Sequence, residues 1–200
     1  MEIRRINFYG GPNIGKTTLV SDLFVCLNKA GLPCGRAEEH IKSWAYEGRS
    51  PTGFDQVHLF GRQIRNEDVI LRNSEETVLC EAPLLLCTYY SRRMGMPGWQ
   101  HLRDLALEFE SFYPALHVML NREEWEYKVA GRYESREQAL QIDSEIEIFL
   151  HECNWVFLED IEKSNGIPLA FVKASPSDPE TVARHVMEAV ESGRKSSISG

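Results

Sequence analysis

The chain has 200 residues, of which 42% are hydrophobic and 26% are charged, and its formal net charge is −8. This size and composition indicate one ordinary globular domain, which we place at 1–192, followed by a flexible tail at 193–200. No apolar run approaches the roughly 20 residues of a membrane helix, and the start MEIRRINFYGG lacks the apolar core of a signal peptide. We therefore exclude an integral membrane protein and expect a cytoplasmic one.

The charge is unevenly distributed along the chain. Residues 104–162 hold 15 acidic and 4 basic residues, whereas residues 1–103 hold 11 acidic and 13 basic residues. Any nucleic-acid partner would therefore have to contact the first half of the chain. The five cysteines include no C-x-x-C pair, which favours buried free thiols over a metal site.

The first predicted element is a short strand over 3–8, and a phosphate-loop pattern follows it directly. The pattern G-x-x-x-x-G-K-[ST] is met by Gly10, Gly15, Lys16 and Thr17 within GGPNIGKTT. Its glycines let successive N–H groups face one concavity, its lysine reaches the β- and γ-phosphates, and its threonine hydroxyl ligates Mg²⁺. We therefore expect ATP and Mg²⁺ as cofactors, held by Gly11, Asn13, Ile14, Gly15, Lys16, Thr17 and Thr18.

A helix is predicted after the loop, because apolar residues recur at helical spacing: Leu19, Val20, Leu23, Phe24 and Leu27. Gly31 is its expected end. Further strands are predicted over 33–38, 77–80, 115–120 and 169–172, with helices in most of the rest. This alternation predicts an α/β fold, in which helices cover both faces of a parallel sheet.

Within the phosphate loop, Asn13 stands where many such loops have glycine, and asparagine is among the residues that best tolerate a positive φ.

The last third of the chain contains two predicted helices and one ambiguous segment. Ser135-Arg136-Glu137-Gln138 can form a capping box, and the apolar face that follows it consists of Ala139, Ile142, Ile146, Phe149, Leu150 and Cys153. A final helix is predicted from about Asp178 to Glu191, with a stop at Gly193. WVFLED, residues 155–160, is either a sixth strand that ends in acids or a continuation of the preceding helix. We favour the helix, because Gly166-Ile167-Pro168 is the better break.

Several stretches of this sequence resemble known P-loop kinases. GGPNIGKTT is similar to the phosphate loop of adenylate kinase and its relatives. EHIKSWAYEGR at 39–49, DQ at 55–56, FGRQ at 60–63 and EAPLLL at 81–86 resemble a group of small bacteriophage P-loop kinases, where the pattern reads roughly E-Y-x-K-x-W-x-x-E-G-R, D-Q, Q and D-S-P-L-L-L. That group includes enzymes that phosphorylate 5-hydroxymethyluracil in phage DNA. Here Glu81-Ala82 replaces the usual Asp-Ser, and His40 replaces the usual Tyr.

The resemblance implies the nucleoside and nucleotide kinase fold, with a five-stranded parallel sheet and an arginine-bearing lid at about 121–134. Glu39 and Glu81 follow the second and third predicted strands, so both should lie at the edge of the sheet that carries the loop. By similarity to nucleoside kinases, Glu39 is the expected general base and Glu81 the expected indirect Mg²⁺ ligand. Arg122 and Arg132 of the lid are expected to stabilise charge on the transferring phosphoryl group.

Candidate residues for binding the phosphate acceptor come from two regions. Residues 89–103 contain three arginines and several aromatic residues but no acid, a composition typical of contact with a single strand or a flipped base, and Arg92 and Arg93 are their first basic residues. The second region is the stretch 44–63, where amide and guanidinium groups can match base edges. Its candidate residues are Trp44, Asp55, Gln56, Arg62 and Gln63. The alternative is that these residues belong to ordinary loops and helix surfaces.

These features lead to three hypotheses. The first is an ATP-dependent kinase that phosphorylates a nucleoside-type hydroxyl, with 5-hydroxymethyluracil in phage DNA as the favoured acceptor and a free nucleotide or nucleoside as the alternative. The second is a P-loop NTPase that transfers phosphate only to water, and it gains support if residues 155–158 form a strand beside the first one. The third is a nucleotide-sensing module that binds without turnover. The sequence leaves the oligomeric state open.

Overall fold

A parallel six-stranded sheet forms the centre of the chain in the part described by the computed structural model, which comprises residues 3–37, 41, 44, 47–49, 51–74, 76–122, 134–153, 156–158 and 170–198. The strands are β1 (Arg5–Tyr9), β2 (Cys34–Ala37), β3 (Thr77–Cys80), β4 (Ala115–Leu120), β5 (Val156–Leu158) and β6 (Ala170–Ala174). Their order in the sheet is β2-β3-β1-β4-β6-β5. All pairs are parallel, so every strand ends at the same edge.

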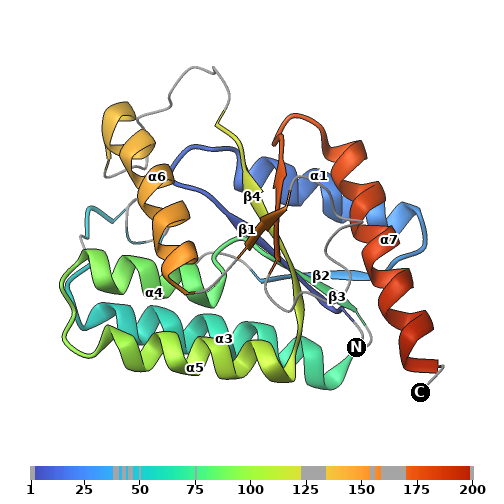
Figure 1. Cartoon of the computed structure of the whole chain (residues 1–200), viewed down its shortest axis with the longest axis horizontal. Helices are drawn as coiled ribbons and strands as arrows, with labels where there is room; N and C mark the ends of the chain where they lie inside the picture. The colour runs from blue at the N-terminus through green and yellow to red at the C-terminus, as the bar shows by residue number, and fades with distance from the viewer. Residues whose placement is uncertain are drawn as a thin grey trace.

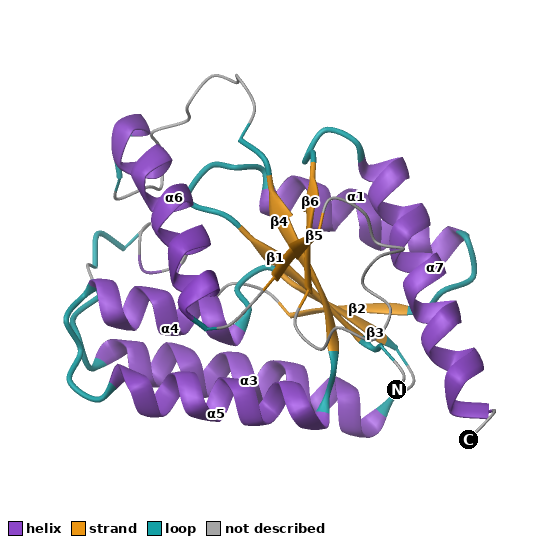
Figure 2. Ribbon diagram, viewed as in Figure 1, coloured by secondary structure: helices purple, strands orange, loops and turns teal. Residues whose placement is uncertain are grey.

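Helices cover both faces of this sheet, as Figures 1 and 2 show. The helices in the described part of the chain are α1 (Lys16–Lys29), α3 (Asp55–Asn73), α4 (Leu84–Arg93), α5 (Trp99–Phe112), α6 (Arg136–Glu152) and α7 (Pro179–Ile198). Helices α1 and α7 pack on one face, where their apolar residues join Ile6 and Phe8 of β1. Helices α3 to α6 pack on the other face, where Tyr9 of β1 joins their core. The phosphate loop therefore leaves the sheet at its centre, between two separate cores.

The α/β class predicted from the sequence is confirmed, and several elements match in detail. Strands β3 and β4 have the predicted bounds, and helix α1 ends before Gly31, which has φ +89°. Ser135 caps α6 in a full capping box with Gln138, and the predicted apolar face of this helix is buried. These are the segments in which periodicity and end signals agree.

Two predictions about the last third of the chain are wrong. Residues 156–158 form strand β5, not a continuation of α6, so the sheet has one strand more than the resemblance implied. Among the described strands, β5 pairs with β6 alone, at the edge of the sheet, and does not lie beside β1. Helix α7 continues through Gly193 to Ile198, where the sequence predicted a stop at Gly193. Most of the predicted lid, residues 123–133, lies outside the described residues.

None of the helices in the described segments combines the length and the apolar character that a membrane span requires. The five cysteines are free thiols, as the sequence predicted. Cys34, Cys80 and Cys153 are buried, whereas Cys26 and Cys87 are half-buried. Burial raises the pKa of the Cys34 and Cys153 thiols to about 11, so both are neutral at pH 7.

Candidate nucleotide-binding site

The phosphate loop connects the central strand β1 to helix α1 through three residues with a positive φ, of which Gly10 has φ +146°. Gly15 has φ +100° and Asn13 has φ +58°, the conformation that asparagine tolerates best among larger residues. Gly15 caps α1, and its carbonyl accepts the Leu19 N–H at 3.0 Å. A helix start that follows such a turn presents backbone N–H groups to an anion. The loop is therefore built to bind phosphate.

The other predicted residues of the loop divide into anchoring and accessible ones. The Lys16 ammonium donates to the carbonyls of Gly10 at 2.5 Å and Gly11 at 3.1 Å. Ile14 is only 2% exposed and packs in the core beneath α1. Thr17 and Thr18 are exposed residues at the first turn of that helix. The Ile14 side chain thus anchors the loop, while the residues that follow it stay accessible to a ligand.

Glu81 follows β3 directly and reaches the first turn of α1. Its Oε2 accepts a hydrogen bond from the Thr17 hydroxyl at 2.7 Å, and its Oε1 pairs with Arg36 Nη2 at 2.9 Å. Glu81 is only 2% exposed, so both of its oxygens are held in place. Hydroxyl and carboxylate oxygens are ligand types that Mg²⁺ prefers. The structure thus brings together the two residues that the sequence assigned to Mg²⁺, and their chemistry fits that ion.

Arg36 is a site residue that the sequence analysis missed. It lies on β2, and its side chain is 26% exposed beside Glu81. A charged residue inside a short strand with buried ends is the signal that could have found it. Glu39, the predicted general base, follows this strand but lies outside the described residues, as does Arg132.

Arg122, from the first residues of the predicted lid, lies against the phosphate loop. Its Nη2 donates to the Pro12 carbonyl at 2.8 Å, and its Nε and Nη2 donate to the two carboxylate oxygens of Asp143 at 2.5 and 3.2 Å. Asp143 also accepts the Gly11 N–H at 2.6 Å, so that group bonds to α6. The sequence analysis missed Asp143, because 132 positions separate it from Gly11 and no local pattern connects them.

Trp44 and Asp55, two predicted acceptor-binding residues, are engaged in contacts within the protein. Trp44 is 6% exposed, stacks on His58 at 6.0 Å between ring centroids, and has Arg49 Cζ 3.6 Å from its ring centroid. Asp55 Oδ1 pairs with Arg49, and its Oδ2 accepts the N–H and the hydroxyl of Thr52. The bonds from Thr52, with Arg49 adding its charge, lower the pKa of Asp55. These contacts fix the start of α3, and the role of the two residues in acceptor binding stays a prediction.

Three other predicted acceptor residues lie on α3. Gln56 is 2% exposed with its Nε2 at 2.9 Å from Met94 Sδ, and Gln63 is 4% exposed with its Nε2 donating to Glu67 Oε1 at 2.7 Å. Each amide would have to exchange this partner to pair with a base edge, and the role of the two glutamines in acceptor binding stays a prediction. Arg62 is exposed on the same helix and remains a candidate.

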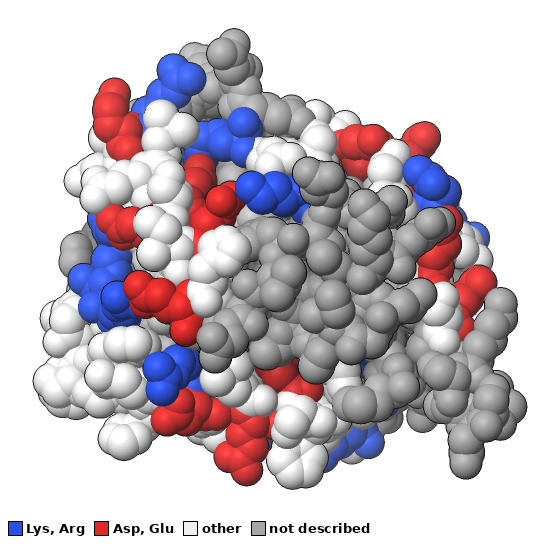
Figure 3. Space-filling model, viewed as in Figure 1, with Lys and Arg blue, Asp and Glu red and all other residues white. Residues whose placement is uncertain are grey.

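Arg92 and Arg93, at the end of α4, pair with acidic residues of α6. Arg92 pairs with Glu152, and Arg93 pairs with Glu145. The segment 89–103 contains no acid of its own, but the fold supplies acids from α6. On the face shown in Figure 3, the described basic and acidic side chains are intermixed. These ion pairs argue against the DNA contact that the sequence suggested for the two arginines.

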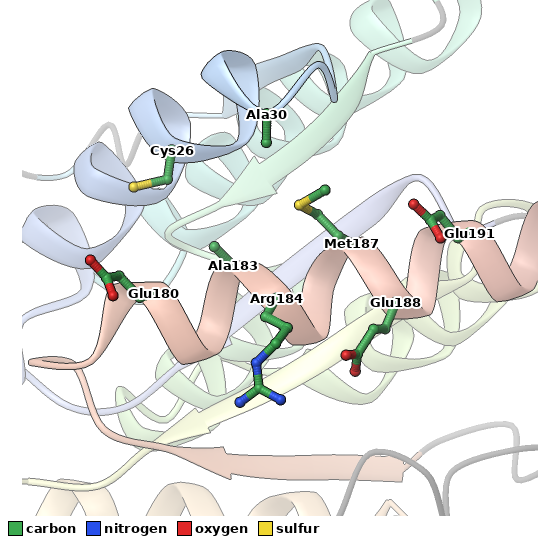
Figure 4. A pocket seen from close by; sticks show the side chains of 8 residues that line it. All are labelled: Cys26, Ala30, Glu180, Ala183, Arg184, Met187, Glu188 and Glu191. Carbon is green, nitrogen blue, oxygen red and sulfur yellow. The ribbon is translucent and has the colours of Figure 1, made fainter.

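A groove of about 430 Å³ lies between α1 and α7. Figure 4 shows Ala183 and Met187 of α7 turned toward Cys26 and Ala30 of α1. The rest of the lining comes from α7, namely Glu180, Arg184, Glu188 and Glu191. Because no residue of the phosphate loop lines it, this groove is separate from the nucleotide site.

Replacing Gly11 with alanine is expected to destabilise the protein by about 1–3 kcal/mol, the usual cost of overpacking. A Cβ at this position would lie 2.6 Å from Asp143 Oδ1 and 3.1 Å from the Ala139 carbonyl, so the loop and α6 would have to separate. Urea unfolding measures the loss. The matched control is Gly61→Ala on α3, where a Cβ meets nothing within 4 Å and alanine should stabilise the helix by about 0.5–1 kcal/mol. Equal effects of the two changes would contradict the close packing at Gly11.

Comparison with known proteins agrees with this geometry. A search of curated proteins gives no match. The family model described as AAA domain matches residues 5–165, a range that includes the phosphate loop, Glu81, Arg122 and Asp143. The match covers most of the chain and supports the P-loop class of nucleotide-binding domains. The chain therefore belongs to the AAA domain family.

Proposed function

We propose that this protein is an ATP-dependent phosphotransferase that moves the γ-phosphate to a nucleoside-type hydroxyl. The observation that carries the proposal is Arg122, which follows β4 and donates from Nη2 to the Pro12 carbonyl of the phosphate loop at 2.8 Å. Phosphoryl transfer needs alignment and charge neutralisation more than covalent chemistry. An arginine from the chain's own lid region supplies both without a second subunit.

Each residue of the site has a distinct role in this proposal. The loop N–H groups and Lys16 bind the β- and γ-phosphates, and Arg122 compensates the negative charge that develops on the transferring group. Thr17 and Glu81 would hold Mg²⁺, which would supply positive charge to neutralise the phosphates. Arg36 keeps Glu81 oriented toward Thr17. Glu39 as general base and Arg132 as a second lid arginine complete the proposal.

The acceptor is the finer part of the proposal. The resemblance to phage kinases favours 5-hydroxymethyluracil in DNA, which would have to be single-stranded or flipped out of the duplex to reach the loop. The ion pairs of Arg92 and Arg93 with α6 favour a smaller acceptor, because they leave less charge available for a DNA backbone. We therefore propose a free nucleoside or nucleotide first and hydroxymethyluracil DNA second.

Hydrolysis of ATP is the second candidate function, and membership of the AAA domain family favours it. From the sequence, a strand at 155–158 would support this hypothesis only if the strand lay beside the first one. Strand β5 lies at the sheet edge, and the neighbours of β1 are β3 and β4. The position of β5 therefore adds nothing to this candidate.

One acceptor screen separates these functions. The protein is incubated with Mg²⁺ and ATP labelled at the γ-phosphate, together with free nucleosides and nucleotides, hydroxymethyluracil DNA, thymine DNA, or no acceptor. Label on an acceptor supports the kinase and identifies its substrate. Inorganic phosphate released at the same rate with and without acceptors identifies an NTPase and overturns the transferase. Binding without turnover identifies a sensing module.

Replacing Glu81 with glutamine is expected to lower Mg²⁺-dependent turnover by about 10–100-fold, the usual effect of losing a group that orients a metal's outer shell. Glutamine keeps the volume but removes the charge that Thr17 and Arg36 contact. Turnover is measured across a Mg²⁺ titration, in which the variant should need more Mg²⁺. Glu188→Gln, an exposed change on α7, is the matched control. An unchanged Mg²⁺ dependence would remove Glu81 from the metal site.

A further inference from the structure

Helix α6 contacts the phosphate loop through one carboxylate that makes three hydrogen bonds. Asp143 accepts the Gly11 N–H at 2.6 Å, and it binds Arg122 through two guanidinium nitrogens, Nε at 2.5 Å and Nη2 at 3.2 Å. Arg122 Nη2 also donates to the Pro12 carbonyl at 2.8 Å. The backbone of residues 11–12, the guanidinium and the carboxylate therefore form a closed ring of contacts.

The packing of α6 fixes this carboxylate. Ala139, Ile142 and Ile146 of the helix are 0% exposed, and the capping box at Ser135 secures its first turn. The loop approaches α6 so closely that a Cβ at position 11 would lie 2.6 Å from Asp143 Oδ1. A carboxylate on a helix with one well-packed face can position its partners more accurately than one on a loop.

One nitrogen of Arg122 is left for a ligand. The Nε and Nη2 edge is taken by Asp143 and Pro12, whereas Nη1 makes no hydrogen bond within the described segments of the chain. The Arg122 side chain is 13% exposed, so few of its rotamers are open once Asp143 holds it. A guanidinium held along one edge can still donate from Nη1 to a phosphate oxygen.

We propose that Asp143 is a positioning residue, which holds Arg122 and the first half of the phosphate loop in the arrangement that binds the nucleotide polyphosphate. The inference rests on the phosphate-binding role proposed above for Arg122. Without Asp143, the nucleotide itself would have to order the long Arg122 side chain, and that ordering lowers affinity. The residue also connects α6, which follows the predicted lid, to Arg122 at the start of that lid.

The test is a double-mutant cycle on ATP affinity. Asp143→Asn keeps an oxygen that can accept the Gly11 N–H, but it loses the negative charge and the bidentate contact with Arg122. We expect it to weaken MgATP binding about tenfold, with an unchanged melting temperature. In an Arg122→Ala background, Asp143→Asn should change affinity less than twofold, because no guanidinium is left to position. The control is Glu147→Gln, a change on the same helix that alters the more exposed ion pair of Glu147 with Lys173 of β6.

A second variant keeps the test independent of folding at position 143. Arg122→Lys keeps the positive charge but cannot bind Asp143 through two nitrogens of one plane, so it should weaken MgATP about as much as Asp143→Asn. Normal binding by either single variant while Arg122→Ala binds poorly would overturn the role of Asp143 alone. Equal losses from Asp143→Asn with and without Arg122 would assign Asp143 a structural role. Normal binding by Arg122→Ala would instead overturn the role of Arg122 in the proposed function.

Discussion

Replacing Lys16 with alanine is expected to lower turnover of ATP by about 10²–10³-fold while the protein stays folded. The Lys16 ammonium bonds the carbonyls of Gly10 and Gly11, so it lies where the loop would receive the β- and γ-phosphates. Alanine removes the positive charge that offsets charge developing on the transferring phosphoryl group. It also favours the helix start at which this residue lies.

Turnover under saturating ATP and the melting temperature together check this expectation. Lys29→Ala removes an exposed charge from the last turn of the same helix and should leave both values unchanged. If Lys16→Ala turned over ATP at nearly the rate of the unaltered protein, the loop would not be the phosphate site. A variant whose melting temperature falls below the assay temperature would assign Lys16 a structural role.

The parts of the site that lie close together in the sequence could be predicted from it. The loop at 10–18 is one contiguous motif, and its spacing already specifies a strand before it and a helix after it. The contact between Thr17 and Glu81 could be predicted as well, because parallel strands bring their carboxyl ends to one edge of the sheet. Topology alone is enough for that contact.

Contacts that depend on how helices pack could not be predicted. Asp143 reaches the loop only because α6 packs against Gly11, and Arg93 finds Glu145 only because α4 lies beside α6. The three residues of β5 show the limit for short apolar runs, which are compatible with either helix or strand. Tertiary packing decided each of these cases.

Replacing Arg5 with methionine is expected to destabilise the fold by about 3–5 kcal/mol, the cost of breaking a buried ion pair by removing one partner. Arg5 is 0% exposed on β1, and its guanidinium pairs with Glu67 of α3 at 2.6 Å and with Glu110 of α5 at 3.0 Å. It also donates to the Tyr113 carbonyl at 2.9 Å. Methionine is apolar and fills much of the space, but it leaves two carboxylates in the interior without their cation.

The size of this loss should depend on pH. Burial by itself raises the pKa of Glu110, but the attraction of Arg5 and His117 outweighs it and holds that pKa below the ordinary 4.5. The ionised carboxylate therefore stabilises the intact protein at pH 7, and this contribution is lost only as the pH falls through the lowered pKa. Without Arg5, burial dominates and raises the pKa, so folding of the variant takes up a proton and becomes more favourable as the pH falls.

Urea unfolding of both proteins at pH 7 and pH 5 measures this difference, which should be smaller at pH 5. The matched control is Arg72→Met, which removes one partner of the more exposed pair with Asp68 on α3 and should cost less than about 1 kcal/mol at either pH. A loss no larger than the control's would show that the interior tolerates the two carboxylates. A large loss that stays the same at both pH values would mean that Arg5 acts through packing and its bond to Tyr113, because only unpaired buried carboxylates make the variant gain stability as the pH falls.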